Sequence, residues 1–457
     1  MGGNARHLAG PPVRNQGTTG MNATPKSNAI ASFSSTHTLG VACALAAGVW
    51  LGAAEAPTKL VNSGLSPYAI SLCMVAGVFT ARWTLPTLLK GTRYVFADLR
   101  VNRHLLLSAI LAGMLWAVAN TLTVFAIRDV GLTIAFPLWN TNSLVGILWG
   151  RLLFGELKGA SGRNVAKVVL GALAIVAAAV MLGYSTINGE GPHAGRAVSG
   201  ILAAAGASLL WGTMYIPYRK AYISGMNPLS FVTVFTIGEL ATVFALVLAL
   251  DGGTGAAVFH SPETRRLLFW LFLGGFAWVI GDLFQQFATK YLGIGRAIPL
   301  SNTNQLWGLA WGALVFGELA HADWSRRLLV VAGSLVMILG ALAVSTAIAT
   351  EREHASMNSA LVRECSRYHL DYDRVMRAYS GAENGSQPGC RPVSNDRRGW
   401  WDYAILAAAV GVFAYLGWNA RVPALSMNLA WFWVLALVLV ASAAAAGWGL
   451  WKATRFS

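Results

Sequence analysis

Two copies of an Asn-Thr-Asn triplet carry the strongest chemical signal in this chain. They lie at 140–142 and 302–304, each near the middle of an apolar segment long enough to cross a membrane. A polar group at that depth is costly unless it faces a partner or a water-filled cavity. Amide side chains offer hydrogen-bond donors and acceptors in fixed geometry. The triplets therefore predict a polar binding site inside the membrane.

The triplets belong to a longer duplicated motif. Residues 137–157, PLWNTNSLVGILWGRLLFGEL, recur without a gap at 299–319 as PLSNTNQLWGLAWGALVFGEL, with 14 of 21 positions identical. This agreement indicates an internal duplication, so we expect function to lie where the two copies meet. Pro137 and Pro299 precede the triplets, and each removes a backbone hydrogen bond and frees a carbonyl at the site.

Aromatic and polar residues from other segments fall near the same depth as the triplets. Indole faces can cover the apolar side of a sugar ring, and amides can bind hydroxyl groups. This mixture fits a neutral polyhydroxylated ligand. The alternative is that the same side chains bond across helices and stabilise packing only. The predicted substrate-binding residues are Trp50, Trp116, Asn120, Trp139, Asn140, Thr141, Asn142, Trp211, Tyr215, Trp278, Asn302, Thr303, Asn304 and Gln305.

Three acidic residues are candidates for proton coupling. Glu239 and Asp282 lie deep in apolar segments, where a charge must be protonated, paired or solvated. Asp282 occupies the position in the second repeat that the neutral Asn120 occupies in the first. We expect such a difference between the repeats if Asp282 is a proton-coupling group. A buried structural carboxyl bonded to a neighbouring glutamine is the alternative. Glu55 lies four residues before Lys59 near the outer end of the first span, so an interfacial ion pair is the simpler interpretation there.

Other charged residues and motifs predict less chemistry. We expect Arg82, Arg151 and Lys220 to extend to the membrane surface on the cytoplasmic side. The chain has no P-loop, Gly-rich dinucleotide motif, HExxH or nucleophile elbow, which argues against ATP-driven pumping and intramembrane hydrolysis. We therefore expect no enzyme, no cofactor and no metal site.

Composition places the chain in the membrane. Of its 457 residues 55% are hydrophobic and 12% are charged, and many apolar runs exceed the length of a spanning helix, which predicts an all-α polytopic protein. The net charge of +15 comes from Lys and Arg spread through short loops. Such residues set membrane topology, so we expect no nucleic-acid partner. The four cysteines are not spaced as a metal site or a disulfide framework.

The apolar segments divide into two units of five. The units are 39–185 and 199–347, and 131–155 and 293–317 are their fourth spans. Because five is odd, the second unit must enter the membrane inverted, as in many secondary transporters. The remaining parts are a disordered tail at 1–38, a soluble segment at 348–400 with a short amphipathic helix, and two additional spans within 401–457.

Basic residues predict the orientation. With the N-terminus inside, the inner loops and tails carry 25 Lys and Arg, and the outer ones carry eight. Positive residues concentrate on the cytoplasmic side, so both termini are expected there. The expected location is the plasma membrane, that is, a bacterial inner membrane. Lipid surrounds the protein, and the sequence leaves a homo-oligomer open.

Three stretches resemble a known family. They are GMLWAVAN at 113–120, WGTMYIPYRK at 211–220 and GRAIPLSNTNQLWGLAWGALVFGE at 295–318. Together with the ten spans they are similar to the glucose/ribose uptake proteins and rhamnose–proton symporters of the drug/metabolite transporter superfamily. The resemblance covers about 39–347.

The resemblance implies proton-coupled uptake of a monosaccharide, with a sugar and a proton as partners. The same superfamily includes proton-coupled exporters of small metabolites or lipophilic cations that use a carboxylate in the first span. Glu55 keeps that alternative open. A third alternative is a membrane receptor or scaffold that binds a partner through 348–457, a region that the resemblance does not cover.

Overall fold

Helices make up the described fold. The computed structural model describes residues 25–54, 56–59, 66–130, 135, 138–185, 197–251, 262–317, 319, 323–380, 398–421 and 427–456, and these contain no strand. Ten of the described helices are long and apolar enough to cross a membrane. The prediction of an all-α polytopic membrane protein is confirmed.

The described helices fall into three parts of the chain. The first half contains α1 (Pro25–Ala54), α2 (Ala56–Lys59), α3 (Pro67–Leu89), α4 (Thr92–Val101), η1 (Arg103–Leu105), α5 (Leu106–Val130), α7 (Asn142–Leu153) and α8 (Gly162–Ser185). The second half contains α9 (Ala197–Ile223), α10 (Pro228–Leu250), α12 (Pro262–Leu292), α13 (Ile294–Ser301), α14 (Asn304–Ala310), η2 (Trp311–Val315) and α15 (Trp324–Ser345). The C-terminal part contains α16 (Glu351–Tyr368), α17 (Tyr372–Ser380), α18 (Trp400–Asn419) and α19 (Leu429–Thr454).

Capping residues fix where several helices begin. Ser66 accepts a hydrogen bond from the Ala69 amide at 3.2 Å and precedes a proline at the first position of α3. Asn227 does the same for α10, accepting from the Leu229 amide at 2.8 Å. A side-chain acceptor satisfies an orphan amide, and proline there costs no hydrogen bond. These local signals set the first turn of each span.

Packing relates the two halves by a pseudo-two-fold. Helix α1 packs along α12 as α9 packs along α5, and α3 on α12 corresponds to α10 on α5. Glycines allow the backbones to touch: a Cβ on Gly113 would collide with the Phe235 carbonyl, and one on Gly275, 162 positions later, with the Met74 carbonyl. Equivalent helices therefore make equivalent contacts, as expected of an inverted repeat.

The two segments that carry the duplicated motif are broken, not continuous. The prediction of single spans over 131–155 and 293–317 is wrong: α7 starts only at Asn142, and the other copy divides into α13, α14 and the π-helical η2. Thr141 Oγ1 donates to the Leu138 carbonyl at 2.6 Å, and Thr303 Oγ1 donates to the Leu300 carbonyl at 2.8 Å. These side chains bond to the backbone of the preceding turn, which competes with helix continuation.

The first predicted segment also differs from the structure. Helix α1 begins at Pro25, well before the predicted start at residue 39. Residues 1–24 of the predicted tail, Glu55 and Pro137 lie outside the described residues. The predicted soluble segment contains two helices, α16 and α17, in place of one.

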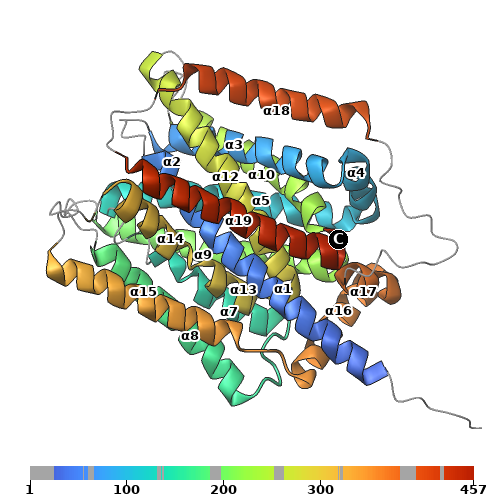
Figure 1. The fold of residues 1–457 in the computed structure, drawn as a ribbon. Coiled ribbons are helices and arrows are strands. Elements are labelled where there is room, and N and C mark those ends of the chain that lie inside the picture. The colour runs from blue at the N-terminus through green and yellow to red at the C-terminus, as the bar shows by residue number, and fades with distance from the viewer. Residues whose placement is uncertain are drawn as a thin grey trace, which may run out of the picture.

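Two further spans are attached to the core. Helix α18 packs on α3 and α12, and α19 packs on α1 and η2. Asp402 near the start of α18 is 1% exposed and accepts hydrogen bonds from the Thr92 amide at 2.8 Å and the Thr92 hydroxyl at 2.6 Å. In Figure 1 the beginning of α1, helices α4, α16 and α17 and the C-terminus gather at one end of the bundle.

Candidate functional site

The two copies of the motif meet through one asparagine. Asn302 Nδ2 lies 2.8 Å from Asn142 Oδ1, 2.6 Å from Ser143 Oγ and 3.4 Å from the Asn140 carbonyl. Asn302, Asn142 and Asn140 are all buried. We call this contact between the copies the asparagine junction.

The second copy keeps buried polar atoms without a protein partner. Asn304 Oδ1 and Gln305 Nε2 are buried and make no hydrogen bond. Buried polar groups are nearly always paired, so an orphan pair needs water or a ligand. The corresponding Asn142 is already bonded, which makes the second copy the side with free hydrogen-bonding capacity.

Helices α1 and α9 approach the two breaks through matched glycines. A Cβ on Gly52 would lie 2.3 Å from the Asn304 carbonyl oxygen, and one on Gly212 would lie 3.1 Å from the Asn142 carbonyl oxygen. A side chain at either position would push the helix away from the break. This close approach brings Trp211, the neighbour of Gly212, toward the centre of the bundle.

Three tryptophans form an aromatic cage. The ring centroids of Trp116 and Trp278 are 5.0 Å apart, those of Trp116 and Trp211 are 6.2 Å apart, and those of Trp211 and Trp278 are 6.3 Å apart. The indole nitrogens of Trp116 and Trp211 are buried without a hydrogen-bond partner. Buried indoles normally find an acceptor. The cage therefore offers aromatic faces together with two unused donors.

A buried ionic triad lies against this cage. Arg82 Nη2 is 2.9 Å from Asp282 Oδ2 and 3.4 Å from Glu239 Oε1, and all three side chains are completely buried. The guanidinium also stacks 4.1 Å from the Phe235 ring centroid and 5.6 Å from that of Trp278. The triad joins α3 of the first half to α10 and α12 of the second.

Arg82 corrects the sequence-based expectation. We predicted that it extends to the membrane surface, but it is 0% exposed. Two deep carboxylates need a cation, and desolvation is tolerated only when the charges are paired. Arg151, by contrast, is exposed at the end of α7 as expected, and Lys220 is partly exposed.

Glutamines and tyrosines extend the triad along α12. Gln286 Nε2 donates to Asp282 Oδ2 at 2.6 Å, and the Tyr222 hydroxyl donates to Gln286 Oε1. Tyr215 donates to Gln285 Oε1 at 3.2 Å. The glutamine contact predicted as the structural alternative for Asp282 is therefore present, together with the ion pair.

One face of α12 is polar for three turns. Trp278, Asp282, Gln286 and Lys290 are spaced by four, so they lie on the same side of the helix. We call these residues the α12 stripe. It leads from the aromatic cage, past the ionic triad, to the end of α12.

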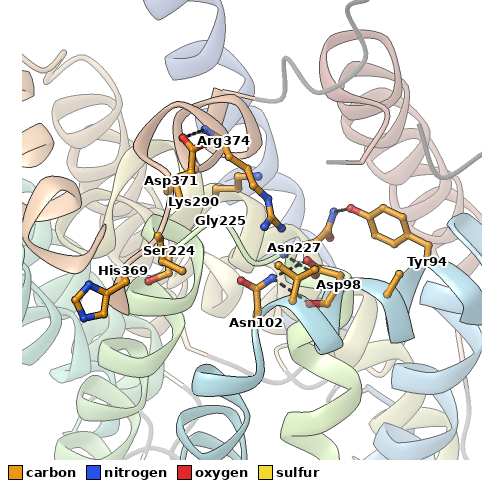
Figure 2. Close-up of a pocket in the computed structure, with 14 residues that line it drawn as sticks. Tyr94, Asp98, Asn102, Ser224, Gly225, Asn227, Lys290, His369, Asp371 and Arg374 are labelled. Atoms are coloured by element: carbon orange, nitrogen blue, oxygen red, sulfur yellow. Dashed lines mark hydrogen bonds between the residues drawn. The ribbon is translucent and has the colours of Figure 1, made fainter. Parts of the chain in front are cut away.

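A polar pocket opens where the α12 stripe ends. It has a volume of about 250 Å³, and Tyr94, Asn102, Ser224, Lys290 and Arg374 are among its lining residues (Figure 2). The Ser224 hydroxyl is buried there without a partner. This space would hold one small polar molecule at the end of the bundle that also carries α4 and α17.

Two other carboxylates hold the same end of the bundle together. Glu156 accepts from the amides of Ile294 at 3.0 Å and Gly295 at 2.8 Å, at the start of α13, and pairs with Arg219 at 3.3 Å. Gly293 makes room for it, because a Cβ there would lie 2.5 Å from Glu156 Oε1. A carboxylate at a helix N-terminus is favoured by the exposed amides.

Glu353 of α16 makes the second contact. It receives two hydrogen bonds from Arg296, at 2.7 and 2.9 Å, and one from the Leu157 amide at 3.1 Å. Burial alone would raise the pKa of Glu353, but Arg296 and the Leu157 amide outweigh it and hold this pKa below its usual value. The bidentate pair ties α16 to α13.

Some predicted site residues lie apart from the cage and the junction. Trp50 Nε1 donates to the Leu439 carbonyl of α19 at 3.1 Å. Trp139 packs in a separate cluster with Ala126 and Ala204. Asn120 Nδ2 donates to Ser71 Oγ at 3.0 Å.

Sequence reasoning missed the roles of three residues of this region, Arg82, Ser143 and Tyr222. Arg82 and Ser143 bond to the predicted site residues Asp282 and Asn302, and Tyr222 donates to Gln286, the glutamine predicted as an alternative partner of Asp282. Arg82 could have been found, since a basic residue inside an apolar run needs a partner and two acids were already placed at that depth. Within the described residues, no group of three or more His, Cys, Asp or Glu could hold a metal ion.

Comparison with known proteins identifies the family. The family model described as sugar transport protein matches residues 67–185 and 202–369. The chain belongs to this family. The match includes the ionic triad and the asparagine junction, whereas α18 and α19 lie outside it.

Several relatives are named, provisionally, as sugar uptake proteins. One from Streptococcus pyogenes serotype M1 is 45% identical over 80 residues, which cover 17% of this chain and 26% of that protein. One from Streptococcus agalactiae serotype V is 31% identical over 144 residues, which cover 31% of this chain and 44% of that protein. The chain thus spans less than half the length of either relative.

Proposed function

We propose that this member of the sugar transport protein family carries a monosaccharide across the plasma membrane as a secondary active transporter, by proton symport with alternating access. The observation that supports it best is the ionic triad of Arg82, Asp282 and Glu239, which is completely buried against the aromatic cage. Charged groups inside a membrane protein commonly mark an ion or substrate pathway.

The sugar lies between the aromatic cage and the second motif copy in this proposal. The Trp116 and Trp211 nitrogens donate to sugar oxygens, and Asn304 Oδ1 and Gln305 Nε2 bind hydroxyl groups. All four atoms are buried without a protein partner. Indole faces cover the CH side of the ring, which fits a glucose- or rhamnose-like ligand.

The proton binds the ionic triad in this proposal. With all groups ionised, one cation faces two carboxylates, so one added proton makes the triad neutral and removes the cost of a net buried charge. Asp282 Oδ2 accepts from both Arg82 and Gln286. Glu239 is held less closely, at 3.4 Å from Arg82 against 2.9 Å for Asp282, so it takes a proton more readily. Glu239 therefore carries the proton, and Asp282 holds Arg82 in place.

Alternating access uses the relation between the two halves. The triad and the asparagine junction both cross from one half to the other. Protonation weakens the hold of Glu239 on Arg82, and the halves then rock about the central site. The pocket at the end of the α12 stripe is the opening on the cytoplasmic side.

Transport in proteoliposomes tests the proposal. Purified protein should take up one or more members of a monosaccharide panel, and uptake should be accompanied by sugar-dependent proton entry measured with an internal pH dye. Trp418→Phe is a suitable control variant, because Trp418 is 92% exposed on α18. If no monosaccharide is transported and lipophilic cations are exported instead, the proposal is wrong.

A further inference from the structure

A groove lies between the transport core and the amphipathic helix α16. Its volume is about 390 Å³, and the end of α7, the end of α9 and one face of α16 form its walls. The groove combines an apolar part with a basic part, and neither belongs to the cage or to the triad.

The apolar part belongs to the membrane-embedded core. Leu152 and Leu153 at the end of α7 are 57% and 44% exposed, and Ile216 of α9 lies beside them in the lining. Exposed leucines at the end of a membrane segment contact hydrocarbon. This part of the groove is therefore open to acyl chains.

The basic part lies where the chain leaves the membrane. Lys220 of α9 and Arg363 and Arg367 of α16 line the groove, and the single acidic residue in the lining is Glu364. No ion pair forms at any of these three cations in the part of the chain that the structure describes. The lining carries a net charge of +2 on this count.

One aromatic ring holds two of the cations in position. Lys220 Nζ lies 4.9 Å from the centroid of Tyr368, and the Arg367 guanidinium carbon lies 5.9 Å from it. Arg363 and Arg367 are four residues apart, so they lie on the same face of α16. The cations therefore converge without being neutralised.

We propose that this groove binds an anionic phospholipid of the surrounding membrane. Its phosphate lies between Lys220, Arg363 and Arg367, and an acyl chain runs along Leu152, Leu153 and Ile216. Basic pockets at the cytoplasmic ends of membrane helices attract anionic headgroups in this way. A soluble phosphate would use the cations alone and leave the apolar part unused. The bound lipid joins α16 to α7 and α9, which lead directly to the asparagine junction and the aromatic cage.

Thermal stability in detergent tests this proposal. Purified full-length protein in a neutral detergent is titrated with phosphatidylglycerol, phosphatidylcholine or inorganic phosphate, and the midpoint of unfolding is measured. We expect phosphatidylglycerol to raise the midpoint at a concentration at least tenfold lower than phosphatidylcholine. Inorganic phosphate should give no comparable shift. Equal responses to the two lipids, or a full response to phosphate, would overturn the proposal.

Variants locate the effect. The double change Arg363→Gln and Arg367→Gln should raise the half-saturating phosphatidylglycerol concentration at least tenfold, because each basic residue near an anionic headgroup contributes about a fivefold factor. Arg363→Lys with Arg367→Lys should stay within threefold of the original protein. Arg100→Gln with Arg163→Gln removes the same charge from exposed sites outside the groove and outside the polar pocket and should have no effect. An unchanged half-saturating concentration in the first variant would overturn the proposal.

A substitution in the apolar part of the groove distinguishes binding of an acyl chain from binding of the phosphate group alone. Leu153→Ser should weaken binding of long-chain phosphatidylglycerol while leaving binding of its dihexanoyl form unchanged. If Leu153→Ser weakens binding of both forms equally, or weakens binding of neither form, the placement of the acyl chain is wrong.

Discussion

Asn302 Nδ2 donates to Asn142 Oδ1 at 2.8 Å, so corresponding triplets of the two motif copies are joined by a direct side-chain hydrogen bond. The two asparagines of the second copy differ in their hydrogen bonding. Asn302 uses its amide within the protein, whereas the oxygen of Asn304 has no partner. Within the second copy, Asn302 thus joins the two halves, and Asn304 keeps an oxygen that the protein does not use.

This difference predicts that two alanine substitutions affect different properties, stability in one case and sugar affinity in the other. Asn302→Ala removes a buried donor from Asn142 and Ser143 and should cost about 1–3 kcal/mol of stability. Asn304→Ala removes an atom without a protein partner, so the unfolding temperature should change little while sugar affinity falls at least tenfold. Thermal unfolding and equilibrium binding on the two variants check this. Unchanged sugar affinity in Asn304→Ala would return that residue to a packing role.

The two carboxylates of the triad should also differ. Glu239→Gln should abolish sugar accumulation driven by a proton gradient but keep sugar counterflow, because the neutral amide mimics the protonated state. Asp282→Asn should reduce stability by about 3 kcal/mol or more, since it removes the carboxylate that holds the buried Arg82 most closely. Gradient-driven accumulation by Glu239→Gln would exclude the coupling role.

The indole nitrogens of the cage should donate to the sugar. Trp211→Phe keeps an aromatic face and removes a buried donor that lacks a protein partner. Sugar affinity should fall by about 1–3 kcal/mol, with little loss of stability. Trp418→Phe on the exposed face of α18 serves as the matched control. A fall of equal size in both variants would indicate a nonspecific effect.

The Glu353–Arg296 pair should make stability depend on pH in the acid range. The pKa of Glu353 is lower in the fold than its ordinary value of 4.5. A group with a depressed pKa stabilises the fold above the unfolded pKa, and this stability is lost as the pH falls through the folded pKa. We therefore expect a loss of stability that begins near pH 4.5 and grows at lower pH.

Glu353→Gln should remove this part of the acid dependence. At pH 7 it should be less stable by about 3 kcal/mol, since Arg296 is left buried without its counter-ion. Unfolding temperatures of both proteins between pH 3 and pH 7 provide the measurement. Parallel pH curves for the two proteins would rule out this contribution.

Two glycines with positive φ differ in what an added side chain would meet. Gly293 has φ of 82° and faces Glu156, whereas Gly317 has φ of 68° and nothing within 4 Å of an added Cβ. Gly317→Ala should cost about 1–2 kcal/mol from backbone strain alone. Gly293→Ala should cost more, because its backbone (φ 82°, ψ 170°) lies in a region essentially restricted to glycine and because an added Cβ displaces the carboxylate that caps α13. Equal losses in thermal unfolding would contradict the role given to Glu156.

Much of this fold could be predicted from sequence because the signals are local or repeated. Apolar length indicates the spans, and the duplicated motif indicates two related units. The break of each motif segment could not be placed, since it depends on side chains such as Thr141 and Thr303 bonding to their own backbone. Hydropathy does not distinguish that arrangement from a continuous helix.

The site was predicted less completely for a geometric reason. Depth along a span can be read from sequence, but the direction in which a side chain points cannot. Trp50 and Trp211 lie at similar positions in α1 and α9, yet Trp50 bonds to α19 and Trp211 faces Trp278. Helix α19 packs on α1 and supplies the carbonyl that Trp50 binds, and nothing in the sequence near Trp50 indicates that partner.

The hydrogen bond from Trp50 to Leu439 joins α1 to α19 across 389 residues. During synthesis, α1 enters the bilayer long before α19 exists. Its indole N–H must meanwhile remain unsatisfied in hydrocarbon or be met by some other acceptor. Helix α19 therefore completes the environment of a helix made much earlier, and a nascent chain cut short before α19 leaves that flank of α1 exposed to lipid.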